Sequence, residues 1–533
     1  MTTFTFNCWS EPWIRCQRLN GESALLSIEQ VLTKAHELYS LIDDSPLVVG
    51  ATNRLLIAIL HFIHQPQELA DVIELIERGA FDRKQLDPFA QHYATRFDIF
   101  DPALPFLQTS DVAINAHLPP APVAKAKKSA ATSLPIKTIA YLFPEIPSET
   151  NRALFKHVLN DDFYLCPACC TAGLAMYPAF AQNGGSGWRA SINGDPPIYT
   201  FPIGQNLFES LSLSLINQHS HLPRQVSQSR AQVAPWTGDG LIEEKKEQHQ
   251  IGYVESLLFP ARRVRLFPIT YHNHCSRCGE FTALAVREMY WKPGAYPIKA
   301  SERWQDPFVG YYIGADKTYK SLHMSIGKAA WREYSTLFLN EPIDGVRQIP
   351  AVVDQYRELV NNSDFSQTIW FRCIGMKTDG KAKVLAWMDE ALSVPARLLE
   401  NPVGRQAVRE ALDQATICAK LLSTSFFQHL DQAQNSKRHR YQTIHDRMLE
   451  RYWHELGQHF LAFVEQSAAV QEPEVHQKRW VETIRAVALQ QLDYGLAQVG
   501  DRADCLRRST EARNAFQAKY YVTLVNPRQG AKP

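Results

Sequence analysis

The stretch that decides the fold runs from Cys166 to Gly204. It begins with Cys166-Pro-Ala-Cys169-Cys170, passes through Asn183-Gly-Gly-Ser-Gly187-Trp-Arg, and ends on Asp195-Pro-Pro-Ile-Tyr-Thr-Phe-Pro-Ile-Gly204. Its opening has the Cys-x-x-Cys spacing of a metal knuckle, and a second such pair, Cys275-Ser-Arg-Cys278, follows far downstream. The glycine-rich part has almost no side chains, so its backbone can approach a ligand closely. The sequence therefore predicts a loop, held by a metal site, that offers its backbone to a partner.

The two cysteine pairs supply the four soft thiolates that zinc takes in a tetrahedron. We predict one structural zinc ion bound by Cys166, Cys169, Cys275 and Cys278. Four unligated thiols are the alternative. Cys170 is interpreted as a buried bystander, and two complete pairs make His272 and His274 unnecessary as ligands. Because four cysteines leave no open coordination position, a catalytic zinc is not expected.

The composition is that of a globular protein in a reducing compartment. The chain has 533 residues, of which 45% are hydrophobic and 21% charged, which is enough for two or more domains. A net charge of +1 excludes neither nucleic acid nor protein partners. No apolar run of about eighteen residues or signal peptide is found, so no membrane association is expected. Ten cysteines are too sparse for a disulfide scaffold, and we expect a cytoplasmic protein.

Residues before about 385 show mixed helix and strand signals. Ser27 is expected to cap a helix that runs toward Tyr39, and the apolar segment Pro46 to His64 predicts a buried helix. Arg262 to Phe267 predicts a strand with a basic edge, which is either a solvated face or an acid-binding one. Asp379-Gly380 between apolar runs predicts a hairpin turn.

Beyond residue 385 the pattern becomes helical. Apolar residues recur at three- and four-residue steps in Gly404 to Leu430, Tyr441 to Gln466, Glu474 to Gln498 and Arg502 to Tyr520. Four such helices with short connections predict an antiparallel four-helix bundle. The predicted fold class is α+β, with a mixed domain and its zinc knuckle at 1–384 and the bundle at 385–533.

Sequence signatures of catalysis are missing. The chain contains no GxxxxGK[ST], HExxH or GxSxG motif. His445 and Asp446 are neighbours in a helical stretch and are not expected to share a face, so we interpret them as ordinary helix positions. These observations favour a binding protein over an enzyme.

The ordered set of motifs resembles the CasA family, the large subunits of the type I-E CRISPR surveillance complex Cascade. The resemblance spans nearly the whole chain. It includes Trp9-Ser-Glu-Pro-Trp-Ile, Pro105-Phe-Leu-Gln-Thr109, Asn151-Arg-Ala-Leu-Phe155, Thr200-Phe201 and Gly252-Tyr-Val-Glu-Ser-Leu-Leu-Phe. The resemblance implies a non-catalytic subunit that recognises the protospacer-adjacent motif on double-stranded DNA. It also implies help in opening the duplex, assembly with other Cascade subunits and guide RNA, and docking of the CRISPR helicase–nuclease.

Family roles map onto particular residues of this chain. The resemblance implies that the motif is read by Lys292, with Lys299 as the competitor, and by a glycine-rich loop made of Asn183, Gly184, Gly185, Ser186 and Gly187. Asn183 and Ser186 stand where glycine is expected. The strand-separating wedge falls on Lys377, Thr378, Asp379, Gly380, Lys381 and Lys383, without the glutamine often found at its tip. Phe155 matches an aromatic residue that contacts the guide complex, with core packing as the alternative.

Two other functions remain open on the sequence. One is a zinc-stabilised enzyme that acts on nucleic acid, and the other is an assembly scaffold without DNA contact. Turnover of nucleic acid by the purified chain would favour the first. Crosslinking to protein but never to DNA would favour the second.

Overall fold

The computed structural model describes residues 4–110, 135–146, 162–181, 191–219, 221–222, 226–238, 251–295, 304–315, 317–340, 348–362, 368–379, 384–430, 441–469 and 473–526. Contacts divide the chain into two compact units. Unit 1 contains residues 1–326, 347–359 and 371–389, and unit 2 contains residues 327–346, 360–370 and 390–533. The division into domains 1–384 and 385–533 stays a prediction.

Unit 1 begins with a three-stranded antiparallel sheet in the order β2-β1-β3. Its strands are β1 (Ile14–Arg18), β2 (Ser23–Leu26) and β3 (Leu38–Leu41). Ser27 caps α1 (Ile28–Thr33) as predicted, because its hydroxyl accepts from the Gln30 amide at 3.2 Å. The helix is shorter than predicted, since the chain turns through a 3₁₀ segment at Ala35–Glu37 and enters β3.

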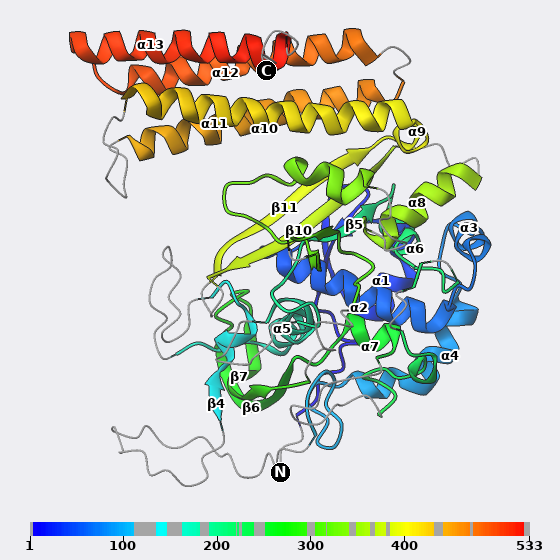
Figure 1. Ribbon diagram of the computed structural model, residues 1–533. Helices are drawn as coiled ribbons and strands as arrows, with labels where there is room; N and C mark the ends of the chain where they lie inside the picture. Colours follow the sequence, from blue (N-terminus) through cyan, green and yellow to red (C-terminus); the bar gives the residue numbers. More distant parts are fainter. Residues whose placement is uncertain are drawn as a thin grey trace. The chain divides into compact units, whose positions relative to one another are not determined.

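The predicted buried helix is α2 (Pro46–His64), which runs through the core of unit 1 (Figure 1). Pro46 occupies the first turn, where its missing amide proton costs nothing, and Gln65 ends the helix in the left-handed region at φ 43°. Among the described residues, α2 is the one helix long and apolar enough to span a membrane. Its most apolar window is 89% buried inside the structure, as expected of a core helix.

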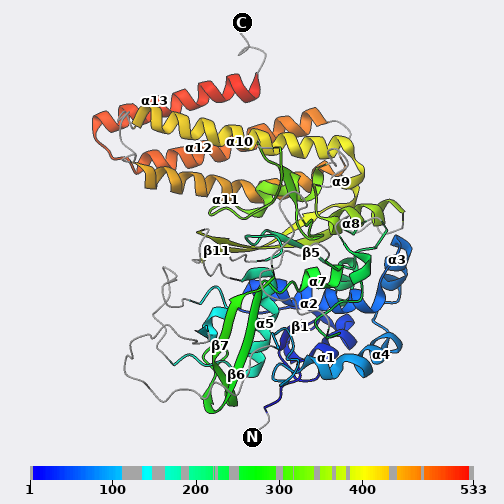
Figure 2. The same cartoon turned by 60° about the horizontal axis from the view of Figure 1, so that its bottom comes forward.

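Two further three-stranded sheets and a small β8-β9 hairpin hold the other strands of the described residues. The first sheet has the order β4-β7-β6, and its long β6–β7 hairpin is visible in Figures 1 and 2. The second has the order β11-β10-β5. Their bounds are β4 (Ile136–Thr138), β5 (Tyr199–Ile203), β6 (Arg262–His274), β7 (Phe281–Pro293), β8 (Tyr311–Ile313), β9 (Tyr319–Ser321), β10 (Ile369–Thr378) and β11 (Val384–Val394). Strands β10 and β11 end and begin on either side of the predicted turn and are hydrogen-bonded neighbours, while Gly380 lies outside the described residues.

The remaining helices of the mixed part are short, apart from α5. They are α3 (Leu69–Glu77), α4 (Arg83–Tyr93), α5 (Pro167–Phe180), α6 (Leu207–Leu213), α7 (Tyr253–Leu257) and α8 (Ala351–Asn362). Helix α5 packs against α2 and touches β7. All but one of its fourteen residues are buried, which explains why its sequence is apolar on every side.

Most of unit 2 is a C-terminal helical region, which begins with the short helix α9 (Ala396–Glu400). Its long helices are α10 (Pro402–Leu430), α11 (Gln442–Ser467), α12 (Pro473–Ala497) and α13 (Ala503–Tyr520), and they lie side by side in Figures 1 and 2. Each begins and ends within two residues of the predicted bounds. Helix α10 packs against α11, α12 and α13. The mixed helix and sheet composition and the helical C-terminus are confirmed.

Candidate functional site

The four cysteines of the two Cys-x-x-Cys pairs meet in unit 1. Their sulfur atoms all lie within 4.8 Å of one another. The Cys166 and Cys278 sulfurs are 3.7 Å apart, and the Cys166 amide donates to the Cys275 sulfur at 3.3 Å. Three of the thiols are buried and Cys278 is half-buried. This geometry and chemistry fit a tetrahedral ion of the zinc class.

Local structure explains how segments so distant in sequence meet. Cys166 is the N-cap of α5, so Cys169 lies in its first turn. Cys275 and Cys278 lie in the turn between β6 and β7, where Gly279 has φ +75° and its amide donates to the Cys275 carbonyl at 3.0 Å. Leu165 pairs with Val286 of β7 at 3.0 and 2.9 Å. The backbone therefore joins the start of α5 to the hairpin beside the sulfurs.

Hydrogen bonds among the four thiols shift their pKa values in opposite directions. Those from the Cys166 and Cys169 thiols lower the pKa of Cys275 below its usual range and that of Cys278 to about 7. The pKa of Cys169 is raised, because its thiol is hydrogen-bonded first to Cys166 and then to the other two sulfurs. A metal ion would displace the thiol protons, because it binds thiolates.

Neighbouring ligand types do not join the cluster. Cys170 is fully buried and its thiol faces the Leu165 carbonyl, at 3.7 Å. His272 and His274 are exposed, and Nδ1 of His274 lies 2.8 Å from the Gly279 carbonyl oxygen. Arg277, between the two ligands of the hairpin, pairs with Asp43 and stacks on the Phe143 ring at 4.6 Å. These contacts of Arg277 hold the turn against residues that do not belong to the cysteine cluster.

Helix α5 leads from the cysteine cluster to the glycine-rich segment alongside β7. At its far end the Tyr177 ring packs edge-on against the Trp291 ring, with centroids 6.3 Å apart. The Tyr177 hydroxyl also donates to the Leu107 carbonyl at 2.9 Å. Trp291 is next to Lys292 in β7, and because successive side chains of a strand point to opposite faces, the Lys292 side chain points away from the face that packs on Tyr177.

Lys292 lies on β7 directly opposite Arg263 of β6. Its ammonium group is 5.6 Å from the centre of the Tyr290 ring, and its side chain is half-buried. The hairpin ends at Gly294, where a Cβ atom would lie 2.0 Å from the Pro260 carbonyl oxygen. Only glycine therefore allows the chain to close beside Lys292.

The prediction of a basic strand edge at Arg262 to Phe267 is wrong for two of its arginines, Arg262 and Arg265. Arg262 and Arg265 are each 1% exposed. The Arg265 guanidinium donates to the carbonyls of Asp101, Pro102 and Thr109 at 3.3, 3.0 and 3.4 Å, and burial lowers its pKa to about 10. Arg265 faces inward because it satisfies these carbonyl groups, whereas Arg262 donates to the Ala261 carbonyl at 2.7 Å. Arg263 alone stays half-exposed.

Several predicted site residues lie outside the described part of the chain. They are Asn183 to Gly187, Phe155, Lys299, Gly380, Lys381 and Lys383. Lys377 and Thr378 end β10, and Asp379 follows them as an exposed residue. Thr378 is 7% exposed, so only Lys377 and Asp379 are accessible among these three.

His445 and Asp446 in α11 do contact each other, contrary to the prediction. Nδ1 of His445 lies 3.2 Å from the Asp446 carboxylate, and Nε2 lies 2.9 Å from the Ser423 hydroxyl of α10. His445 is 7% exposed. Its place between two helices fits a packing role.

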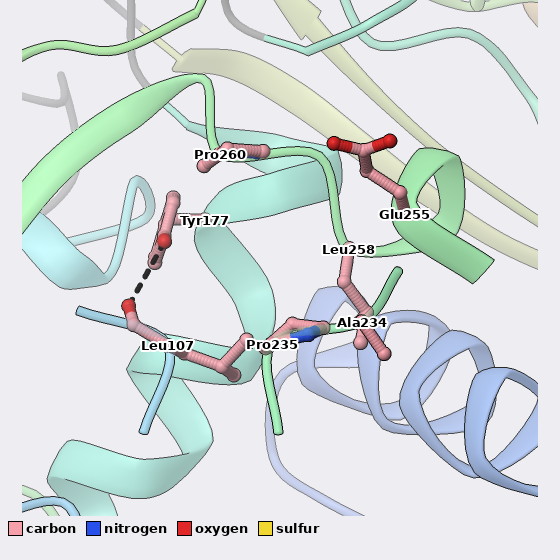
Figure 3. A pocket seen from close by; sticks show the side chains of 7 residues that line it. All are labelled: Leu107, Tyr177, Ala234, Pro235, Glu255, Leu258 and Pro260. Atoms are coloured by element: carbon pink, nitrogen blue, oxygen red, sulfur yellow. Dashed lines mark hydrogen bonds between the residues drawn. The ribbon is translucent and has the colours of Figure 1, made fainter. Parts of the chain in front are cut away.

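A small cavity lies beside Tyr177, lined by Leu107, Tyr177, Ala234, Pro235, Glu255, Leu258 and Pro260 (Figure 3). It has room for about one water molecule. Its carboxylate, Glu255, is bound by Arg230 at 2.8 and 2.6 Å and by the Gly252 amide at 3.1 Å. The cavity is therefore a small gap in the packing around Leu107 and Tyr177.

Sequence reasoning missed a buried ion pair in the core of unit 1. Arg54 of α2 binds Asp306 through two hydrogen bonds, at 3.1 and 2.8 Å, and both side chains are 2% exposed. The lone arginine within an apolar helix is a signal that a buried carboxylate must exist. The partner lies 252 residues away, and no local pattern identifies it.

Comparisons with known proteins give the family. The model of the family described as CRISPR-associated protein Cse1 matches residues 7–491. The CRISPR-associated protein CasA/Cse1 of Thermus thermophilus is 27% identical over 420 residues, which cover 77% of this chain and 75% of that protein. The chain belongs to the CRISPR-associated Cse1 family, and the resemblance noted in the sequence is confirmed.

Solved structures share the fold. The crystal structure of CRISPR-associated protein Cse1 from Acidimicrobium ferrooxidans has a TM-score of 0.72 at 20% identity and covers 100% of both chains. A chain in a structure described as a CRISPR RNA-guided surveillance complex has a TM-score of 0.68 at 17% identity. It covers 96% of this chain and 99% of that one.

Proposed function

We propose that this chain is the large subunit of an RNA-guided CRISPR surveillance complex. It recognises a short motif next to the target in double-stranded DNA and assists opening of the duplex. Membership of the Cse1 family supports the proposal, as does the similarity to a chain of a CRISPR RNA-guided surveillance complex. In this role the chain assembles with the other Cascade subunits and guide RNA and docks the helicase–nuclease.

One observation carries the DNA-reading part of the proposal. Helix α5 and strand β7 are tied together at one end by the four cysteines and touch at the other through Tyr177 and Trp291. The glycine-rich segment follows α5 directly, and Lys292 follows Trp291. The support for the proposal is therefore one of chain connection: the segment that follows α5 and the residue that follows Trp291 both continue from elements that the cysteine cluster holds together.

These groups suit a modest reading task in the minor groove. That groove presents largely an A·T-versus-G·C pattern, so a protein reading it tolerates related motifs. In RNA-guided complexes, base pairing with the guide supplies most of the sequence specificity, and protein reads only a short adjacent motif. Glycine amides in Asn183 to Gly187 and the Lys292 ammonium group are sufficient donors for that purpose.

The metal we assign to the cysteine cluster is structural zinc. Four thiolates complete a tetrahedron and leave no open position for substrate, so the role we propose is non-catalytic. The zinc would fix α5 against the hairpin and thereby the start of the glycine-rich segment. None of the ten cysteines forms a disulfide, which supports a cytoplasmic protein.

The turn from Lys377 to Lys383 is the proposed strand-separating wedge. It joins β10 and β11, and Asp379 is exposed at its start. A narrow Asp-Gly tip can enter between base pairs, while flanking lysines attract the displaced phosphates. Guide pairing then supplies most of the energy that unstacking requires.

Replacing Lys292 with alanine tests the proposal. The complex carrying Lys292→Ala should bind a motif-bearing duplex about tenfold more weakly, and single-stranded target nearly as well as before. Lys84→Ala, at an exposed position of α4, is the matched control for loss of one positive charge. Equal weakening on both targets would make Lys292 a general electrostatic contact. A complex that crosslinks to DNA nowhere on this chain would instead make the chain a scaffold.

A further inference from the structure

Arg277 lies between the two cysteines of the β6–β7 turn and contacts three separate segments of unit 1. Its guanidinium forms an ion pair with the Asp43 carboxylate and lies 4.6 Å from the centre of the Phe143 ring. It also hydrogen-bonds to the sulfur of Cys169 in α5. The Arg277 side chain is 16% exposed and that of Asp43 is 9% exposed. These contacts are therefore largely shielded from water, which strengthens their electrostatic part.

Zinc in the cysteine cluster would leave a negative charge that needs compensation, because four thiolates outweigh the charge of one zinc ion. Three of the four cysteines are buried, and a buried charge is costly unless an opposite charge and hydrogen bonds accompany it. Arginine supplies both, since its guanidinium stays charged and carries several N–H donors. All four sulfurs lie within 4.8 Å of one another, so a cation bonded to Cys169 lies beside the whole cluster.

The surroundings of Arg277 keep its guanidinium charged and oriented. Burial alone would lower the pKa of Arg277, but the negative charges of Asp43 and Cys169, and hydrogen bonds with both, raise it above its usual value. The Asp43 carboxylate also accepts from the Ser45 amide at 2.9 Å, just before α2 begins at Pro46. A carboxylate fixed at the start of the core helix therefore holds the guanidinium beside the sulfur.

We propose that Arg277 stabilises the metal-bound form of the cysteine cluster through its hydrogen bond to the Cys169 sulfur. A group that hydrogen-bonds to a metal ligand fixes the orientation of that ligand and tunes its electron density. Asp43 and Phe143 hold the guanidinium in place for this task. The inference rests on the assignment of zinc to the cluster.

A tether that only holds the turn in place is the simpler alternative for Arg277. The backbone of the turn has its own anchors, however. The Ser276 amide donates to the Tyr164 carbonyl at 2.8 Å, and the Tyr164 amide donates to the Ser276 hydroxyl at 2.9 Å. The Cys275 amide donates to the Glu280 carbonyl at 2.8 Å. Loss of the guanidinium should therefore affect the bound metal more than the turn.

Zinc affinity of the purified full chain, measured by competition with a chromophoric chelator, tests the proposal. Arg277→Met keeps an apolar stem but removes the charge and the donors, and we expect it to weaken zinc binding roughly ten- to a hundredfold. Arg277→Gln keeps a donor without the charge and should weaken binding by about tenfold.

Two control variants separate this role from a tether. Arg287→Met, on the same hairpin, removes a guanidinium that lies 5.8 Å from the Tyr164 ring centre, and it should keep the wild-type affinity. Asp43→Asn retains an oxygen that can accept from Arg277 but removes the ion pair, and it should weaken zinc binding by no more than about threefold.

Cobalt(II) in place of zinc gives a readout that a tether would not change. Without an N–H donor on its sulfur, a thiolate gives up electron density more easily. The thiolate-to-cobalt charge-transfer absorption should therefore move to longer wavelength in Arg277→Met and stay at the wild-type position in Arg287→Met and Asp43→Asn.

The outcomes separate the proposal from the zinc assignment. A wild-type chain that binds no zinc would refute the assignment itself. A wild-type chain that binds zinc, with Arg277→Met unchanged in affinity and absorption, would overturn only the role of Arg277. Equal weakening in Asp43→Asn and Arg277→Met, with an unmoved cobalt absorption, would make Arg277 a tether. Should Arg277→Met fail to fold, wild-type affinity in Arg277→Gln would overturn the proposal.

Discussion

Cys278 is the most accessible of the four cysteines, and replacing it measures how much the cluster stabilises unit 1. We predict that Cys278→Ser eliminates zinc binding and lowers the stability of unit 1 by roughly a few kcal/mol. The loss should be smaller than the ~10–16 kcal/mol apparent in zinc-finger peptides, because unit 1 has its own apolar core. Elemental analysis and denaturant unfolding of the purified chain check both parts.

Cys505→Ser is the matched control for loss of a thiol. Cys505 is half-buried in α13, far in sequence from the cluster. This variant should keep the full metal content and the wild-type unfolding curve. Native wild-type protein without zinc would remove the metal assignment, whatever the variants do.

Single residues also show where sequence reasoning was sufficient. The spacing of the cysteine pairs identified four side chains that do converge, because two Cys-x-x-Cys pairs in a long chain favour a shared metal site over four unligated thiols. The inward orientation of Arg265 was not predictable, since its partners are backbone carbonyls of a distant segment. Asp306 was missed because its partner, Arg54, lies 252 residues away in the sequence.

At the scale of elements, Gly457 marks where the segment before α8 packs on α11. A Cβ at Gly457 would lie 2.7 Å from Nε1 of Trp331, a side chain that is 4% exposed. The Trp331 ring also packs on Phe460 at 4.9 Å and Trp453 at 5.7 Å, so it has little room to move. We predict that Gly457→Ala destabilises unit 2 by about 1–2 kcal/mol, because overpacking outweighs the gain in helix propensity.

Gly495→Ala in α12 is the comparison variant. Its Cβ would meet Met448 Sδ at 3.2 Å, and methionine adapts easily because its side chain is flexible. This variant should leave stability unchanged or raise it by up to about 1 kcal/mol. Denaturant unfolding followed by tryptophan fluorescence measures both. Effects of the same sign would contradict the packing argument.

The β10–β11 turn carries the next prediction at this scale. Shortening the turn, with Lys381 and Lys383 changed to alanine, should slow opening of an intact target duplex by the complex. A target already mismatched beside the motif should be bound nearly normally, because no base pairs remain to be separated there. Strand opening is followed by a fluorescent base next to the motif.

The control replaces two exposed lysines elsewhere, Lys34 and Lys84, with alanine. It removes the same charge without touching the turn and should open duplex at the wild-type rate. If the shortened turn weakens binding to both targets equally, the turn anchors DNA without opening it.

The sequence predicted helices best where the hydrophobic pattern extends over many residues. The four C-terminal helices and the buried α2 were predicted within a few residues, because amphipathic or uniformly apolar runs of that length have one common explanation. The end of α1 was predicted too late, since the turn into β3 depends on pairing with β1. Pairing of β5 with β10 joins segments too far apart for any local pattern to show.

For the whole molecule, family membership was the strongest conclusion the sequence allowed. It rested on several motifs in one order, none of which is specific alone. The order of motifs does not show how α5 packs along β7. That packing depends on contacts between residues far apart in the sequence, such as Tyr177 with Trp291. This arrangement links the cysteine cluster to the proposed reading of DNA.

The central claim is that this chain reads a motif in double-stranded DNA, and a motif-library binding measurement tests it most directly. The chain is assembled with the other Cascade subunits and guide RNA, and targets with randomised bases beside the guide-matched sequence are selected by binding. We expect enrichment of a small set of related motifs, which disappears when this chain is left out of the complex. Uniform recovery of all motifs, or enrichment that persists without this chain, would contradict it.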